Sequence, residues 1–209
     1  RLYIFDTTLR DGAQTQGVDF SLEDKEKIAL ALDNLGVDYI EAGWPGANPT
    51  DTEFFQKKHE FKNSKLTSFG MTKRSGRSAE NDTGLSAIMN SNTSAVCLVG
   101  KSWDFHVDVA LGITNEENLD NISESAKHFV KAKKEFMFDA EHFFDGYKAN
   151  PKYAISCIKA AYDQGARWVV LCDTNGGTLP HEVTQIVSEI TKVVPGKNLG
   201  IHAHNDTGN

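Results

Sequence analysis

The feature that most constrains the fold is a regular alternation of short β-like runs with amphipathic helical segments. Seven such runs begin at intervals of 34, 28, 29, 41, 32 and 31 residues along the chain. They span residues 3–9, 37–43, 65–71, 94–100, 135–141, 167–173 and 198–204. Strands that alternate with helices pair in parallel, because a parallel connection needs a crossover of about a dozen residues or more. The rhythm therefore predicts an α/β fold with a parallel sheet.

Local start and stop signals support the helices between these runs. Ser21 and Asp24 have the spacing of a capping box, and Gly36 is placed to end the helix that they begin. Pro151 and Pro180 stand at the first positions of two further helical patterns, where proline is favoured. These signals predict that most of the connections are helical.

Periodicity alone leaves a doubly wound sheet and a (β/α)8 barrel open, but the strand ends separate them. Five of the seven runs finish in segments with ionisable groups, "DTTLRDG", "IEAGWPG", "FDAEHFFDG", "CDTNGG" and "HAHND". A doubly wound sheet concentrates its chemistry at one switch point, whereas a barrel gathers it from the carboxyl ends of many strands. We therefore expect a (β/α)8 TIM barrel, incomplete here, with about seven of its eight strands within residues 1–209.

Composition excludes several classes of function. Acidic residues exceed basic ones by 29 − 22 = 7, and the basic residues are scattered, which argues against a nucleic-acid partner. No run approaches the roughly 18 apolar residues of a membrane span, so we expect no membrane association. Cys97, Cys157 and Cys172 each sit in an apolar run, which is typical of reduced core thiols in a cytoplasmic protein.

The sharpest local pattern is the pair His202 and His204. Residues two apart in a strand point to the same face, so both imidazoles could reach one metal ion. Two hydrogen-bonded histidines without a metal are the alternative. Asp11, at another strand end, is the best candidate for a third ligand, and such a set suits Zn, Mn, Fe(II) or Mg. Asn205 and Asp206 would then orient the ligands.

Arg10, next to Asp11 in "LRDGAQ", is a fixed cation with several hydrogen-bond donors. It suits a carboxylate substrate or a developing oxyanion. The alternative is an ion pair with Glu41 or Asp6 at the barrel rim. We expect both to be partly true, with Glu41 holding Arg10 in place.

Two acidic residues of the fifth run, Asp139 and Glu141, fall on one face. Paired acids in an apolar pocket are suited to proton transfer, and a structural role for Glu141 is the alternative. Thr174 offers a hydroxyl beside a glycine-rich turn, where it could contact an anion or cap a helix. His106 and His142 are weaker candidates for the lining of a substrate pocket.

Three motifs carry a resemblance that runs along nearly the whole chain. "FDTTLRDGAQ", the E-A-G-x-P pattern after the second run and "HAHND" resemble the acyl-CoA-dependent condensing enzymes of the DRE-TIM metallolyase superfamily. That superfamily includes 2-isopropylmalate, homocitrate and citramalate synthases and the 3-hydroxy-3-methylglutaryl-CoA lyases. "FDAEHFFDGYKANP" and "LCDTNGGTLPHEV" resemble the citramalate synthase branch.

The resemblance implies a reaction in which acetyl-CoA, pyruvate and water give citramalate and CoA, in isoleucine biosynthesis. A divalent metal (Mg, Mn or Zn) and Arg10 would hold the 2-oxo acid, with Thr174 near its carboxylate and Glu141 taking part in proton transfer. Gln14 and Glu41 match positions that support the metal and Arg10. Gln14, His106 and Asp139 are expected to line the substrate site. The implied metal ligands are Asp11, His202 and His204.

The family also has parts that these residues do not include. An eighth strand, C-terminal subdomains that close over acetyl-CoA, and usually a regulatory domain would follow, so we expect residues 1–209 to be a truncated catalytic barrel. A homodimer is what the family implies. Three alternatives stay open: a 2-isopropylmalate synthase acting on 2-oxoisovalerate, a hydroxyacyl-CoA lyase of the same superfamily, and a barrel that binds its ligands without catalysis.

Overall fold

The computed structural model describes residues 1–208, and it contains a seven-stranded sheet. The strand order in the sheet is the same as the order in the chain, and the first with the second, the second with the third, the fifth with the sixth and the sixth with the seventh strand pair in parallel. The strands are β1 (Phe5–Asp6), β2 (Tyr39–Glu41), β3 (Lys65–Met71), β4 (Ala95–Lys101), β5 (Glu135–Glu141), β6 (Trp168–Asp173) and β7 (Leu199–Ala203). A singly wound parallel order of this kind is that of a (β/α)8 barrel.

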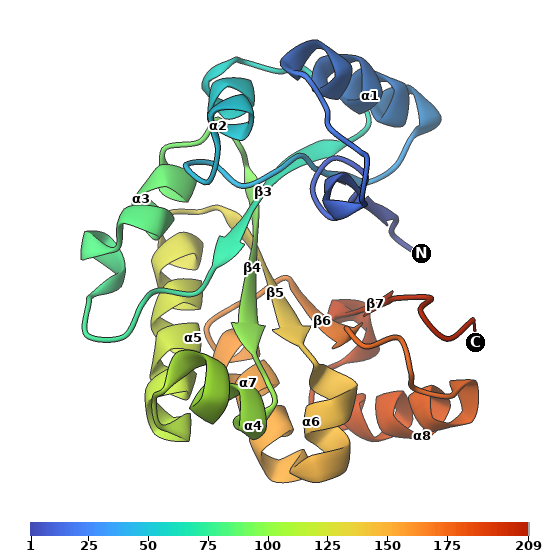
Figure 1. Ribbon diagram of the computed structural model, residues 1–209. Coiled ribbons are helices and arrows are strands. Elements are labelled where there is room, and N and C mark those ends of the chain that lie inside the picture. The colour runs from blue at the N-terminus through green and yellow to red at the C-terminus, as the bar shows by residue number, and fades with distance from the viewer. Residues whose placement is uncertain (209) are drawn as a thin grey trace. The chain divides into compact units, whose positions relative to one another are not determined.

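Helices occupy the connections between the strands (Figure 1). The α-helices are α1 (Leu22–Leu35), α2 (Pro49–Gln56), α3 (Thr83–Met89), α4 (Asp104–His106), α5 (Asn115–Lys131), α6 (Phe143–Ala149), α7 (Pro151–Tyr162) and α8 (Pro180–Ile190). Short 3-10 segments cover Gly12–Gln14, Ala79–Asn81 and Gly196–Asn198, and Val107–Leu111 forms one π-helical turn after α4.

The chain divides into two structural units. The first contains residues 1–71 and 80–97, and the second contains residues 72–79 and the chain from Leu98 onward. The boundary falls inside β4, between Cys97 and Leu98.

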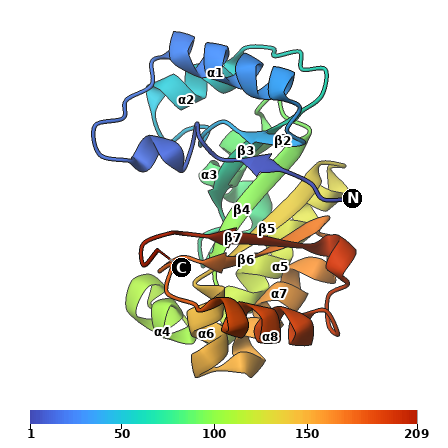
Figure 2. The ribbon, with the colours of Figure 1, turned by 90° about the vertical axis from the view of Figure 1, so that its right-hand side faces the viewer.

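In the first unit, α1 and α2 pack together beside β2 (Figure 2). The expected capping box begins α1: Ser21 Oγ accepts from Asp24 N at 3.2 Å, and Ser21 N donates to Asp24 Oδ2 at 3.0 Å. Gly36 ends the helix with a φ of 87°, in the left-handed region that glycine favours. The core of this unit comprises Leu9, Ala29, Val37, Ile40, Ala42, Phe54, Phe55 and Leu66.

In the second unit, α5 and α7 pack together and α7 contacts β5 and β6. Phe136 of β5 points toward this helical layer, and its ring stacks on that of Phe129 in α5 with centroids 6.2 Å apart. Strand residues alternate between faces, so Asp139 and Glu141 share the opposite face from Phe136. The helix side of β5 is therefore hydrophobic core, and the other side carries the acidic residues.

The first two strands are shorter than the expected runs 3–9 and 37–43. The chain leaves β1 after Asp6 and turns back on itself, because the amides of Arg10, Asp11 and Gly12 all donate to the carbonyl of Thr7 at 3.1, 2.9 and 3.1 Å. The polar end of the run is thus a tight loop and not part of the sheet.

Residues 1–208 bear on two expectations from composition, which concern membrane spans and the cysteines. None of their helices is both long and apolar enough to cross a membrane. Cys97, Cys157 and Cys172 are all buried, and they form no disulfide within the described chain.

Candidate active site

Arg10, in the first unit, is held by a buried carboxylate. Its Nε lies 2.7 Å from Glu41 Oε2, and Glu41 is fully buried. Arg10 Nη1 lies 3.2 Å from Asp11 Oδ1, and the guanidinium carbon lies 3.9 Å from the centre of the Phe69 ring. Of the two partners expected for Arg10, the structure gives Glu41, while Asp6 Oδ1 accepts from Thr8 N at 2.9 Å. The guanidinium is therefore fixed by an ion pair and an aromatic face together.

A buried lysine, which the sequence analysis did not single out, joins the ends of β1 and β2. Lys25 of α1 donates to the carbonyls of Leu9 at 3.0 Å and Ala42 at 2.7 Å, and it forms an ion pair with Asp51. Gly43 leaves room for this pair, because a Cβ there would lie 2.5 Å from the Asp51 carboxylate. Lys25 thus fixes the loop that carries Arg10 and Asp11. Its place on an amphipathic helix gave no signal, because its partners are distant in the sequence.

Glu141, in the second unit, is paired with a cation. Lys101, the last residue of β4, places its Nζ 2.5 Å from Glu141 Oε2. Ser102 fixes the backbone of the glutamate, since its amide and hydroxyl donate to the Glu141 carbonyl at 3.2 and 2.6 Å. The expected apolar surroundings of Asp139 and Glu141 therefore need a correction. Asp139 is buried at 6% exposure, but the immediate neighbour of Glu141 is a lysine.

Thr174 supports the same corner of the second unit. Its Oγ1 accepts from the amide of His142 at 2.9 Å. His142 has a φ of 53°, an uncommon conformation for a residue other than glycine. Thr174 thus holds the backbone next to Glu141. The helix-capping role considered for it is not what the structure shows, because α8 begins only at Pro180.

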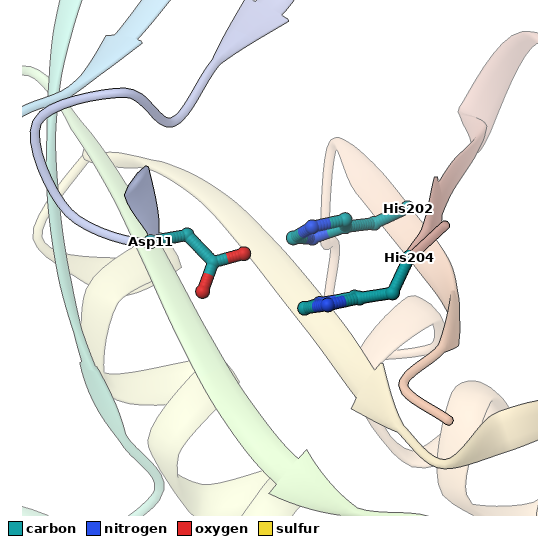
Figure 3. A group of neighbouring side chains, drawn as sticks. All are labelled: Asp11, His202 and His204. Carbon is teal, nitrogen blue, oxygen red and sulfur yellow. The ribbon is translucent and has the colours of Figure 1, made fainter. Parts of the chain in front are cut away.

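The two histidines of the "HAHND" motif present their rings side by side. His202 lies in β7, and His204 follows the strand directly. Their ring centroids are 5.1 Å apart and the ring planes differ by 15°, so both rings face the same way (Figure 3). His202 is partly buried and His204 is exposed. The arrangement matches the alternation expected for residues two apart in a strand.

The glycine-rich turn after β6 fixes the backbone of His204. The amide of His204 donates to the Asp173 carbonyl at 3.2 Å, and the Thr207 hydroxyl donates to the Gly176 carbonyl at 2.5 Å. A Cβ on Gly176 would lie 2.6 Å from the carbonyl oxygen of His204, so only glycine allows this approach. The turn thus serves to position the histidine.

His106 lies in an aromatic group of the second unit. Its ring centroid is 4.4 Å from that of His142, in an edge-on arrangement, and 4.7 Å from that of Trp103. Burial lowers the pKa of His106, and the nearby charges of His142 and Lys101 act in the same direction. A neutral imidazole is therefore favoured at this position.

The remaining candidates stay predictions. Gln14 ends the short 3-10 turn after Asp11 and is exposed. Asn205 and Asp206 are exposed in the bend after His204.

The available donors fit a divalent metal. The two parallel imidazoles of His202 and His204, in the second unit, offer nitrogen ligands, and Asp11, in the first unit, offers a carboxylate that is 18% exposed. Imidazole suits Zn and Fe, whereas carboxylate suits Mg and Mn, so this mixed donor chemistry is compatible with each of the metals expected.

Comparisons with known proteins identify a family and several relatives that are similar to the chain. The HMGL-like family matches residues 1–209. The chain is 53% identical to the (R)-citramalate synthase of Aquifex aeolicus over 99% of its own length and 40% of that relative. It is similar to two enzymes of Sulfolobus acidocaldarius: 47% identical to an (R)-citramalate synthase (98% of the chain, 39% of the relative) and 31% identical to a 2-isopropylmalate synthase (100% and 52%).

Among solved structures, the chain resembles hydroxymethylglutaryl-CoA lyase from Pseudomonas aeruginosa with a TM-score of 0.82 at 17% identity. The match covers 100% of this chain and 70% of that one. This likeness confirms the expected α/β barrel fold. The chain spans about 40% of the length of the curated (R)-citramalate synthases it matches. Because the family match covers every residue from 1 to 209, the chain belongs to the HMGL-like family.

Proposed function

We propose that residues 1–209 form the catalytic barrel of an enzyme that condenses acetyl-CoA with pyruvate and water to give citramalate and CoA. The observation that carries this proposal is the difference in similarity within the family. Five (R)-citramalate synthases are 44–53% identical to the chain, whereas three 2-isopropylmalate synthases are 31–32% identical. The likeness to the lyase concerns the fold alone.

The first part of the proposed mechanism is binding of the 2-oxo acid. Asp11, His202 and His204 would hold a divalent metal, as the family resemblance implies, and each of them follows or ends a strand on its carboxyl side. Such a metal, when bound, polarises a ketone as a Lewis acid. Arg10 contributes a guanidinium that Glu41 and Phe69 keep in one orientation, and its remaining donors are suited to the oxygens of the 2-oxo acid.

The second part is proton removal from acetyl-CoA. Glu141 accepts a proton from the acetyl methyl group, and the electron pair left on that carbon forms a C–C bond with the keto carbon of pyruvate. The keto oxygen takes up one proton in return and becomes a hydroxyl, so this step has no net proton change. Water then cleaves the thioester, and the thiol leaves as CoA. Lys101 and Ser102 hold the side chain and backbone of Glu141 for this step. Thr174 fixes the adjacent backbone through His142.

Substrate choice tests the proposal directly. The full-length protein is incubated with acetyl-CoA, Mg²⁺ or Mn²⁺, and either pyruvate or 2-oxoisovalerate. CoA thiol release is measured, and the product is identified by mass. We expect pyruvate-dependent release of CoA and a product with the mass of citramalate. A strong preference for 2-oxoisovalerate would instead assign the chain to the isopropylmalate synthases. No release with either acid would contradict both assignments.

Three further parts of the proposal concern the whole protein. We expect acetyl-CoA and a small 2-oxo acid as its organic substrates, a homodimer as its assembly and the cytoplasm as its location. Sedimentation of the full-length protein tests the dimer, which the family resemblance supports.

A further inference from the structure

Three adjacent strands of the second unit bring an unusual set of donors onto one face. Cys172 of β6 is the register partner of His202 in β7, and Asp139 of β5 is the partner of Val170, two residues before Cys172. Paired residues of neighbouring strands share a face, and residues two apart share it too. Asp139, Cys172 and His202 therefore all point to the side of the sheet opposite Phe136.

These side chains are close enough to bind a common ion. One carboxylate oxygen, the thiol sulfur and one ring nitrogen all lie within 4.8 Å of one another. Asp139 is 6% exposed and Cys172 is 7% exposed, so the donors lie in a largely dehydrated position. Ligands of a tetrahedral zinc ion are about 3–4 Å apart, given metal–ligand bonds of about 2.0–2.3 Å. Small rotations of the side chains would bring the three atoms to these distances.

We propose that Asp139, Cys172 and His202 form a second metal position, which takes a thiophilic divalent cation such as Zn²⁺, Cd²⁺ or Co²⁺. The thiolate gives the selectivity, because sulfur ligands favour soft and borderline metals over Mg²⁺ and Mn²⁺. The thiol loses its proton to solvent as the cation binds. The burial of Asp139 and Cys172 limits the water that can compete with these two ligands.

This position shares His202 with the proposed catalytic metal site. A neutral imidazole has one lone pair for a metal, so a cation bound to Cys172 withdraws His202 from its catalytic partner ion. Thiophilic cations would thus inhibit by competition, while Mg²⁺ and Mn²⁺ would not occupy the thiolate position. This consequence rests on the proposed function, whereas the binding itself does not.

Cobalt spectroscopy tests the binding without any turnover. Co²⁺ is added to the metal-free full-length protein, and the near-ultraviolet thiolate-to-cobalt charge-transfer band is recorded. We expect the band in the unmodified protein and its loss in Cys172→Ala. Cys157→Ala is the matched control: burial raises the pKa of the Cys157 thiol to about 12, so that thiol stays protonated and the band should be unchanged. A band that persists in Cys172→Ala, or none in the unmodified protein, would overturn the proposal.

Two further variants secure the result. Asp139→Asn keeps the volume of the side chain and should weaken the band at a given Co²⁺ concentration, so the test does not depend on one cysteine variant folding. Asp11→Asn removes a proposed catalytic ligand and should abolish turnover while leaving the band intact. If the protein makes no citramalate, the function fails but the cobalt band still decides the metal position.

Inhibition is the second readout. With Mn²⁺ as the activating ion, we expect Cys172→Ala to need at least tenfold more Zn²⁺ for half-inhibition than the unmodified protein. Equal sensitivity of the two proteins to Zn²⁺ would overturn the competition through His202.

Discussion

The two ion pairs of the candidate active site differ in how far they are from water. Arg10 and Glu41, in the first unit, have side chains that are 13% and 0% exposed. Lys101 and Glu141, in the second unit, are 17% and 24% exposed. A buried carboxylate that loses its cation is left as an uncompensated charge, whereas a carboxylate in contact with solvent can still be hydrated by water. The first pair therefore holds a guanidinium in one orientation, and the second leaves a carboxylate that is partly open to solvent.

Breaking the buried pair should have the largest effect on stability. Arg10→Met leaves Glu41 buried without its arginine, and we expect the free energy of unfolding to fall by about 3–5 kcal/mol. The double variant Arg10→Met/Glu41→Leu should recover most of this loss, because it removes the buried charge as well. Denaturation of the full-length protein can be followed by the fluorescence of Trp44, whose ring packs edge-on against Phe69 at 5.7 Å.

A control for this prediction comes from an exposed pair on α1. Lys27 and Glu23 form an ion pair with side chains that are 70% and 73% exposed. Lys27→Met should lower stability by less than about 1 kcal/mol. If Arg10→Met were no more harmful than Lys27→Met, the buried pair would not have the structural weight assigned to it.

Breaking the second pair should affect turnover more than stability. Lys101→Met removes the cation that orients Glu141, and we expect kcat to fall by about 10- to 100-fold, the scale of a misplaced catalytic group. Because both side chains are partly exposed, the change in unfolding free energy should be about 1 kcal/mol or less. Steady-state kinetics with pyruvate and acetyl-CoA, together with denaturation, measure both effects.

The conservative variant distinguishes positioning from a general structural effect. Lys101→Arg keeps a cation in reach of Glu141 and should recover part of the lost kcat, whereas Glu141→Gln should lose activity whichever residue stands at position 101. If Lys101→Met and Lys101→Arg lost the same activity, the charge of Lys101 would not be what positions Glu141.

The sequence predicted the features that local patterns encode and missed the ones that depend on distant partners. All seven strands were expected, and so was the Ser21–Asp24 capping box, because periodicity and capping are written locally. Glu41 was one of two partners expected for Arg10, because both residues stand at strand ends. Lys25 and Lys101 were not expected to matter. The Leu9 carbonyl is 16 residues from Lys25 in the sequence, and Glu141 is 40 residues from Lys101. Contacts of these two side chains therefore become visible only in the folded structure.

The local sequence also failed to predict the surroundings of Glu141. Two acids on one face, Asp139 and Glu141, predicted an apolar pocket shared by like charges. In the folded chain, β4 lies next to β5 and ends with Lys101, which forms an ion pair with Glu141. The spacing of residues within β5 does not predict this cation. Which residues share a face follows from the period of a strand, but what the neighbouring strand contributes depends on register and strand length.

The smallest expected effect concerns His106, which is close to the second pair. Burial lowers the pKa of His106 below its usual value, the charges of His142 and Lys101 add to this, and Glu141 and Asp145 oppose it. The unfolded chain therefore takes up this proton first as the pH falls through about 6.5. Stability tied to neutral His106 is present above that pH and is lost as the pH falls toward the lower pKa of the folded state.

His106→Gln should flatten the acid side of the stability profile by about 1 kcal/mol or less per pH unit. His181→Gln, at an exposed position on α8, is the control for the substitution itself. Denaturation between about pH 5 and 7, with a chelator present to exclude metal binding by His202 and His204, measures both slopes over the range where histidine titrates. Equal slopes for His106→Gln and the unmodified protein would mean that His106 titrates alike in the folded and unfolded chain, and that the charges around Glu141 do not reach it.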